Sequence, residues 1–198
     1  EISCSLVGSE MCIRDSYFNP EKEVVSLCYT GNTFINNSSF RGRLKETTQM
    51  GVERMGDDSP EADAEILAMT VECLLATGLT EFQVSVGQVD YYKAIFAQTG
   101  LSQEEEEELR ELISQKNYFG VEELVKNKNM DKSLARVLSQ LPQMFGSTEV
   151  LEKAKSLTDN PQALKAVARL EEIYELLKVY GYEKYVTFDF AMLSKYHY

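Results

Sequence analysis

The chain has 198 residues, 43% hydrophobic and 26% charged, and this composition is typical of a folded globular protein rather than a disordered one. Its 32 acidic and 20 basic side chains give a formal charge of −12, which opposes a phosphate backbone, so we expect no nucleic-acid partner. The longest apolar run is far short of the roughly 20 residues that a membrane-spanning helix needs, so we expect no membrane partner.

Metal and redox chemistry have little support in the sequence. The cysteines at positions 4, 12, 28 and 73 form no CxxC pair and the chain has one histidine, so no usual zinc spacing is present. This cysteine usage fits a reducing compartment best, and we expect the protein in the cytoplasm. Acidic residues gather at 57–65 and 104–108. Both runs suit caps and first turns of helices, and successive helical carboxylates point in different directions, so capping is favoured over a cation site.

The two ends of the chain are unusual. Residues 1–16 have neither helical nor strand periodicity nor the apolar centre of a signal peptide, and they resemble translated adapter sequence, so they are left out of the fold prediction. The last residues follow an apolar run without a turn or capping signal. We therefore expect the chain to be an internal fragment of a longer protein.

The first predicted elements are a hairpin and a helix. Residues 23–30 are apolar and rich in β-forming residues, and residues 49–56 follow across a polar loop, so the two segments are expected to pair as antiparallel strands with a long tip. A helix capped by Asp58 or Ser59 is predicted to run to Gly78. Its apolar face is expected to comprise Ile66, Met69, Val71, Leu74 and Leu75.

The later elements alternate between strands and helices. Period-2 alternation predicts a strand at 82–87, and a short helix is predicted at 89–98. Residues 101–160 predict helices only, and a longer helix is expected at 161–180, followed by a strand at 185–192. The core-facing stripe predicted for the long helix comprises Leu164, Val167, Ala168, Leu170, Ile173, Leu177 and Tyr180. This order of elements favours an α+β fold over a doubly wound sheet.

Motifs of common enzyme classes are missing, since the sequence lacks GxGxxG, GxxxxGK[ST], HExxH and GxSxG. The most informative short segment is QMGVE at 49–53, because on a strand Gln49, Gly51 and Glu53 share one face. One interpretation is an ordinary solvated sheet edge. The other is an enclosed site, in which a gap over Gly51 between an amide and a carboxylate suits a small ligand with hydrogen-bond donors, such as an amine or an imidazole.

Several segments resemble class II histidyl-tRNA synthetases. Residues 28–34 (CYTGNTF), 40–43 (FRGR) and 49–53 resemble motif 2 and its surroundings, and 192–198 (MLSKYHY) is similar to the start of the histidine-specific signature. The resemblance covers residues 17–198. It implies an antiparallel sheet of class II aminoacyl-tRNA synthetase type flanked by helices, without a cofactor. Residues 17–100 and 161–198 would form the core, and 101–160 a helical insertion.

The sequence departs from these enzymes at charged positions. Their motif 2 has the form FRxE, in which the arginine holds the phosphate of the adenylate, whereas this chain has Ile35 and Asn37 at the two charged places. Ser194 stands where the second signature begins with arginine. Isoleucine offers no charge-assisted donor, so adenylate formation would lose several kcal/mol of stabilisation. Arg43 is a candidate remnant of the phosphate-contacting groups.

Gln49 and Glu53, in contrast, match the family's histidine-contacting positions. Their retention without the activating arginines resembles the catalytically inert paralogues of the family, the regulatory subunits of ATP phosphoribosyltransferase. That resemblance implies a non-catalytic protein in the first step of histidine biosynthesis. Its partners would be a short-form catalytic subunit, L-histidine as feedback effector and, in the full-length protein, further copies of itself. An active histidine–tRNA ligase remains the alternative, and Ile35 and Ser194 discriminate between the two.

Overall fold

The computed structural model describes residues 18, 23–34, 44–128 and 130–193. The chain forms two compact units, the first up to Ala62 and the second from Asp63, and each is described by itself. The described part of the chain contains an antiparallel hairpin, a small mixed sheet and a succession of four helices between strands, which confirms the predicted α+β class. Among the described residues, no helix is both long and apolar enough to cross a membrane.

The first unit contains an antiparallel hairpin of β1 (Val25–Phe34) and β2 (Glu46–Met55). The pairing was predicted, but the ladder reaches further towards the tip than the sequence indicated. Polar side chains explain the extension, because the hydroxyls of Thr33 and Thr47 lie 2.9 Å apart across the strands and Asn32 Nδ2 donates to Glu46 Oε1 at 2.8 Å. Cross-strand hydrogen bonds of this kind stabilise strands that a hydrophobic pattern does not reveal.

A network of polar groups joins the end of β2 to α2 (Pro60–Ala76). Asp57 accepts a hydrogen bond from the Ser59 backbone N–H at 3.2 Å and pairs with Arg54 Nη2 at 2.8 Å. The hydrogen bond from Ser59, followed by the contact with Arg54, lowers the pKa of the Asp57 carboxyl. Ser59 Oγ in turn accepts from the Ala62 N–H at 3.2 Å, so Ser59 is the N-cap and one of the two predicted caps is confirmed.

The buried face of α2 differs from the prediction. Val71 is buried as expected, but Ile66, Met69, Leu74 and Leu75 are only half-buried. The residues that reach the core are mostly small, namely Ala62, Ala64 and Ala68. A search for large apolar residues overlooks alanines, which bury little area but let a helix approach its neighbours closely.

The sheet of the second unit is built around β5 (Val186–Asp189). β3 (Val84–Val86) runs parallel to β5 on one side, and β4 (Phe145–Gly146) runs antiparallel on the other. All residues of β5 are buried, as befits a central strand. The prediction that residues 101–160 form helices only is wrong at Phe145 and Gly146, because a two-residue strand is too short to show a period.

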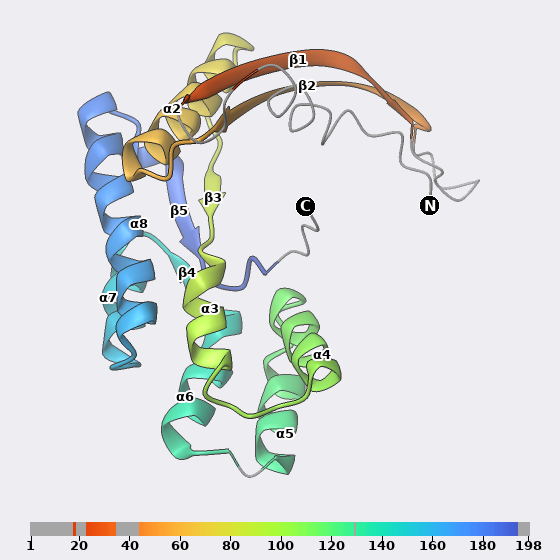
Figure 1. The fold of residues 1–198 in the computed structure, drawn as a ribbon, viewed down its shortest axis with the longest axis vertical. Helices are drawn as coiled ribbons and strands as arrows, with labels where there is room; N and C mark the ends of the chain where they lie inside the picture. Colours follow the sequence, from red (N-terminus) through yellow and green to blue (C-terminus); the bar gives the residue numbers. More distant parts are fainter. Residues whose placement is uncertain (1–17, 19–22, 35–43, 129, 194–198) are drawn as a thin grey trace. The chain divides into compact units, whose positions relative to one another are not determined.

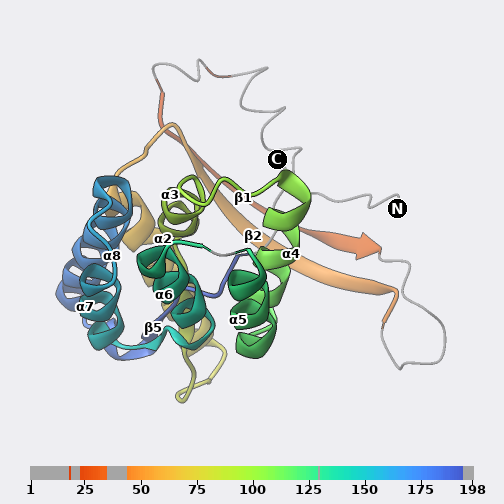
Figure 2. The same cartoon turned by 90° about the horizontal axis from the view of Figure 1, so that it is seen from below.

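The helices of this unit are α3 (Val89–Phe96), α4 (Gln103–Ser114), α5 (Tyr118–Asn127), α6 (Lys132–Gln140), α7 (Thr148–Ser156) and α8 (Pro161–Tyr180), with 3₁₀ turns at Leu141–Gln143 and Glu183–Tyr185. Figures 1 and 2 show α7 beside α8, and α3 also packs against α8. Helices α4, α5 and α6 follow α3 along the chain, and α5 packs against both α4 and α6 (Figures 1 and 2). These helices and the strand β5 enclose one hydrophobic core.

The acidic run at 104–108 begins α4, as predicted. Ser102 accepts from the Glu105 backbone N–H while the Glu105 carboxylate accepts from the Ser102 N–H, which completes a capping box. Glu105 also pairs with Lys128, and this contact, followed by the hydrogen bonds with Ser102, lowers the pKa of Glu105 to about 2. Within the part of the chain that the structure describes, no group of three or more His, Cys, Asp or Glu residues is arranged to hold a metal ion.

The ends of α8 follow the sequence prediction closely. Asn160 caps its first turn and Gly181, at φ 76°, ends it in a left-handed conformation. Val167, Leu170, Ile173 and Leu177 are buried as expected. Two members of the predicted stripe are nevertheless exposed, because Ala168 lies about 100° around the helix from Val167 and Tyr180 lies in the last turn beyond the core.

An ion pair ties the helical region to the sheet. Lys116 Nζ donates to Asp189 Oδ2 at 2.8 Å and lies 4.9 Å from the centre of the Phe145 ring, while Asp189 Oδ1 accepts from the Ala191 N–H at 2.9 Å. Asp189 is buried on β5, and Lys116 has a φ of 56°, a left-handed conformation that glycine adopts readily and lysine rarely adopts. The lysine therefore stands at a strained position from which its ammonium reaches a buried carboxylate.

We expect the Lys116→Met variant to lower the free energy of unfolding by about 1 to 2 kcal/mol, because it leaves Asp189 buried without its cation while the half-exposed lysine limits the loss. Lys116→Gly should be more stable than Lys116→Met by about 1 kcal/mol, since glycine accepts a positive φ. Urea denaturation measures both, with the exposed Lys165→Met as control. A Lys116→Met variant as stable as the parent would show that the ion pair contributes nothing.

Candidate functional site

The two faces of the β1–β2 hairpin differ in exposure. One face carries Leu27, Tyr29 and Gly31 opposite Glu53, Gly51 and Gln49, and all six are half-buried. The same face is buried at both ends, at Val25 with Met55 and at Thr33. The other face is mostly exposed, with 70% of Met50 open to solvent. The predicted site residues thus lie together on the more protected face, which favours a binding surface over a fully solvated edge.

The space over Gly51 is occupied by Tyr29. These two residues are direct cross-strand partners, and a Cβ atom added to Gly51 would overlap Cζ and the hydroxyl oxygen of Tyr29. The Tyr29 hydroxyl accepts a hydrogen bond from Gln49 Nε2 at 2.9 Å. The gap expected over Gly51 is therefore filled by an aromatic ring, which packs on the glycine as aromatic side chains do across β-sheets.

Tyr29 is the residue of this face that the sequence prediction missed. Its alternation along β1 was visible, but its partner on β2 depends on the register of a hairpin whose tip has no recognisable turn motif. An aromatic residue in one strand and a glycine in the other was the available signal. Without the register, that signal could not be used.

Glu53 is the charged group of the face. It stands opposite Leu27, two residues from Gly51, and is half-buried. Among the described residues its carboxylate has no hydrogen-bond or ion-pair partner, whereas Asp57 and Asp63 are paired with Arg54 and Arg169. A half-buried, unpaired carboxylate beside an amide is suited to accept from a cation or from an imidazole N–H.

The other predicted site residues cannot be placed on this surface. Ile35, Asn37, Arg43 and Ser194 lie outside the described residues. The acidic cluster near the start of α2 is accounted for by its contacts, because Asp57 joins the Ser59 cap and Asp63 pairs with Arg169 Nη2 at 2.8 Å. The candidate site therefore consists of Gln49, Glu53 and the newly identified Tyr29.

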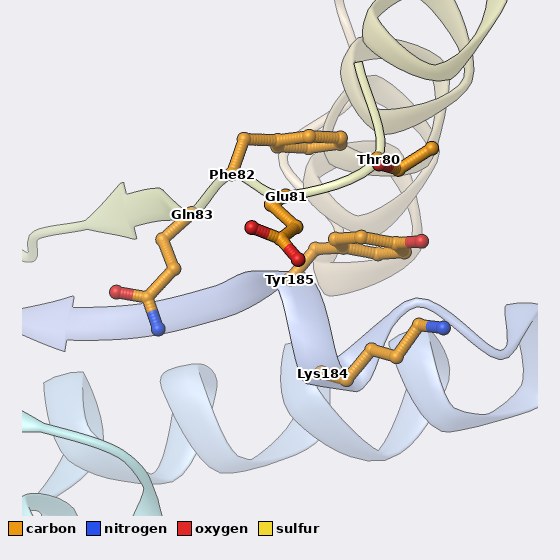
Figure 3. Close-up of a pocket in the computed structure, with 6 residues that line it drawn as sticks. All are labelled: Thr80, Glu81, Phe82, Gln83, Lys184 and Tyr185. Atoms are coloured by element: carbon orange, nitrogen blue, oxygen red, sulfur yellow. The ribbon is translucent and has the colours of Figure 1, made fainter. Parts of the chain in front are cut away.

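A pocket of about 500 Å³ lies elsewhere, in the second unit, at the start of β3 and of β5. Figure 3 shows the Phe82 ring above the Tyr185 ring, and the two stack with centroids 4.7 Å apart. The other residues that line the pocket are Thr80, Glu81, Gln83 and Lys184, and all four are exposed. A ligand there would keep most of its hydration, and the two rings contact each other rather than leaving a slot between them. This pocket is a weaker candidate than the hairpin face.

Comparison with known proteins identifies what the chain resembles. Residues 13–198 match the family model described as histidyl-tRNA synthetase. An ATP phosphoribosyltransferase regulatory subunit of Acetivibrio thermocellus is 40% identical over 172 residues, which are 87% of this chain and 41% of that protein. A protein of the same name from Clostridium kluyveri is 39% identical over 190 residues, 95% of this chain and 47% of that protein.

Two solved structures share the fold. One is described as an ATP phosphoribosyltransferase regulatory subunit/histidyl-tRNA synthetase from Bacillus halodurans, with a TM-score of 0.77 and 30% identity over 90% of this chain and 45% of that one. The other is an ATP phosphoribosyl transferase (HisG:HisZ) complex from Thermotoga maritima, with a TM-score of 0.65 and 17% identity over 93% of this chain and 63% of that one. They confirm the predicted synthetase-type fold. The chain spans less than half the length of the curated relatives given above.

We expect Gly51→Ala to destabilise the protein by about 1 kcal/mol, because the added methyl group displaces the Tyr29 ring and breaks its hydrogen bond with Gln49. In a Tyr29→Ala background the same change should cost nothing, since the ring is gone. Thermal unfolding of the four proteins measures this coupling, and Met50→Ala on the exposed face is the control. Equal costs in both backgrounds would show that the ring does not lie on Gly51.

Proposed function

The chain belongs to the histidyl-tRNA synthetase family, and within that family we propose that its full-length protein is a non-catalytic regulatory subunit of ATP phosphoribosyltransferase. The observation that carries the proposal is the shared name of its relatives, which are 34% to 40% identical over most of this chain. Such a subunit acts in the first step of histidine biosynthesis, where it would transmit feedback by the end product.

The departures at Ile35, Asn37 and Ser194 support a non-catalytic role. Formation of an aminoacyl adenylate builds negative charge on the phosphate, which ligases stabilise with arginine. Isoleucine, asparagine and serine bring no positive charge to these places. A protein that keeps the amino-acid site but loses the cationic groups can bind histidine without activating it.

The hairpin face supports histidine as the ligand. Glu53 supplies an unpaired, half-buried carboxylate that can accept from the imidazole, and Gln49 supplies an amide for the polar end of the amino acid. Both lie on the same face of β2, two residues to either side of Gly51. Arg43 remains a candidate remnant of the family's phosphate contacts and has no part in the proposed histidine site.

The relatives' name implies a catalytic subunit as partner, and we propose that this subunit is of the short form. A feedback role requires that histidine favour a less active state of the assembly, and by linkage the assembly must change histidine affinity by the same factor, typically fivefold or more. The chain has a formal charge of −12, and charge alone would attract it to any basic surface. Specific docking would therefore depend on shape and apolar contact more than on charge. We also propose that the full-length protein associates with itself and works in the cytoplasm.

A histidine–tRNA ligase is the second candidate, because the matching family model is named for that activity. The two functions make opposite demands on the site. A ligase must stabilise the adenylate, whereas a regulatory subunit needs only differential affinity for histidine between two states.

The test uses the full-length protein that contains this sequence, co-expressed with a short catalytic subunit from the same organism. We expect the two to co-purify and the rate of phosphoribosyl transfer to ATP to differ from that of the catalytic subunit alone. The same preparation should show no histidine-dependent exchange of pyrophosphate into ATP. Exchange at about 1 per second or more would identify a ligase, and two proteins that neither associate nor alter the rate would exclude the regulatory role.

A further inference from the structure

Tyr29 makes two contacts that bear on the histidine site proposed above. Its ring lies on Gly51, where no other side chain could fit without moving it. Its hydroxyl accepts from Gln49 Nε2 at 2.9 Å. Tyr29 and Gln49 are not direct partners in the ladder, since Gln49 stands opposite Gly31, so the hydrogen bond crosses the hairpin diagonally. The glycines at 31 and 51 leave this diagonal open.

In the observed hydrogen bond, Gln49 Nε2 is the donor and the Tyr29 hydroxyl oxygen is the acceptor. The nitrogen and oxygen of an amide lie on opposite sides of Cδ, so holding Nε2 against Tyr29 turns Oε1 away from the ring. A tyrosine hydroxyl can also donate, so Tyr29 can bond to the flipped amide through Oε1, and the amide N–H groups would then face the site. In the observed orientation, the site presents two acceptors, the Gln49 carbonyl oxygen and the Glu53 carboxylate.

Two acceptors match a ligand that carries two donors. Free histidine has an α-ammonium group and an imidazole N–H, and an ammonium has donors only. A flipped amide would turn its N–H groups towards that ammonium and repel it. The observed orientation matches the ammonium, and in this orientation Gln49 Nε2 has the Tyr29 hydroxyl as its acceptor.

We propose that Tyr29 is a positioning residue of this site, which accepts from Gln49 Nε2 and so stabilises the amide orientation in which the carbonyl oxygen accepts from the α-ammonium group of histidine. The Tyr29 ring packs on Gly51, and this contact holds the hydroxyl beside Gln49. The inference rests on the proposed binding of histidine at Gln49 and Glu53. It adds a residue that acts through Gln49 rather than by contact with the ligand.

The test compares Tyr29→Phe with the parent in the full-length protein, by calorimetric titration with histidine and with 3-(imidazol-4-yl)propanoate, which lacks the ammonium group. Phenylalanine keeps the ring on Gly51 and removes only the hydroxyl. We expect histidine affinity to fall about threefold to tenfold, while the affinity for the propanoate stays the same. In a Gln49→Ala background, Tyr29→Phe should have no further effect on histidine, because there is no amide left to orient.

Two control variants separate the possible failures. Glu53→Ala should lower the affinity for both ligands. Tyr180→Phe, which removes a hydroxyl from an exposed ring in the other unit, should change neither affinity. Circular dichroism melting checks that each variant is folded. If Glu53→Ala lowers the affinity for histidine but Tyr29→Phe does not, the role proposed for Tyr29 is wrong and the proposed site stands. Equal weakening of both ligands by Tyr29→Phe, or the same loss with and without Gln49, also overturns it. A parent that binds no histidine overturns the site and the role together.

Discussion

The antiparallel register of β1 and β2 is the constraint on which the candidate site depends. Side chains alternate between the faces of a strand, so a shift of one residue would move Gln49, Gly51 and Glu53 together to the exposed face. The observed register instead places Gly51 opposite Tyr29. That pairing brings together a ring, an amide and a carboxylate, and cross-strand hydrogen bonds near the tip, such as that between Thr33 and Thr47, help to hold it.

The second unit is organised around a different strand. β5 is buried on both faces and pairs with β3 and β4, and the helices α3 and α8 pack against each other within the same core. The ion pair between Lys116 and Asp189 fixes the turn between α4 and α5 to the end of β5. A small number of polar contacts thus joins the helical region to the sheet, while apolar packing supplies most of the stability.

Much of this architecture could be predicted because its signals are local. Ser59 and Gly181 mark helix ends through the chemistry of caps, and a period of two residues identified the face that carries Gln49 and Glu53. What could not be predicted depends on partners far apart in the sequence. Tyr29 meets Gly51 only through the hairpin register, and Phe145 becomes part of a strand only because β5 lies beside it. The burial of Ala64 and Ala68, likewise, follows from close helix packing rather than from large apolar side chains.

The central proposal is that the full-length protein senses histidine for a partner enzyme, and feedback inhibition of the reconstituted complex tests it most directly. The measurement is the histidine concentration that halves the rate of phosphoribosyl transfer, with the parent protein and with Glu53→Ala. The account predicts a concentration about tenfold or more higher for the variant, because a charged acceptor is removed from the site. The same inhibition by histidine in both complexes would contradict it.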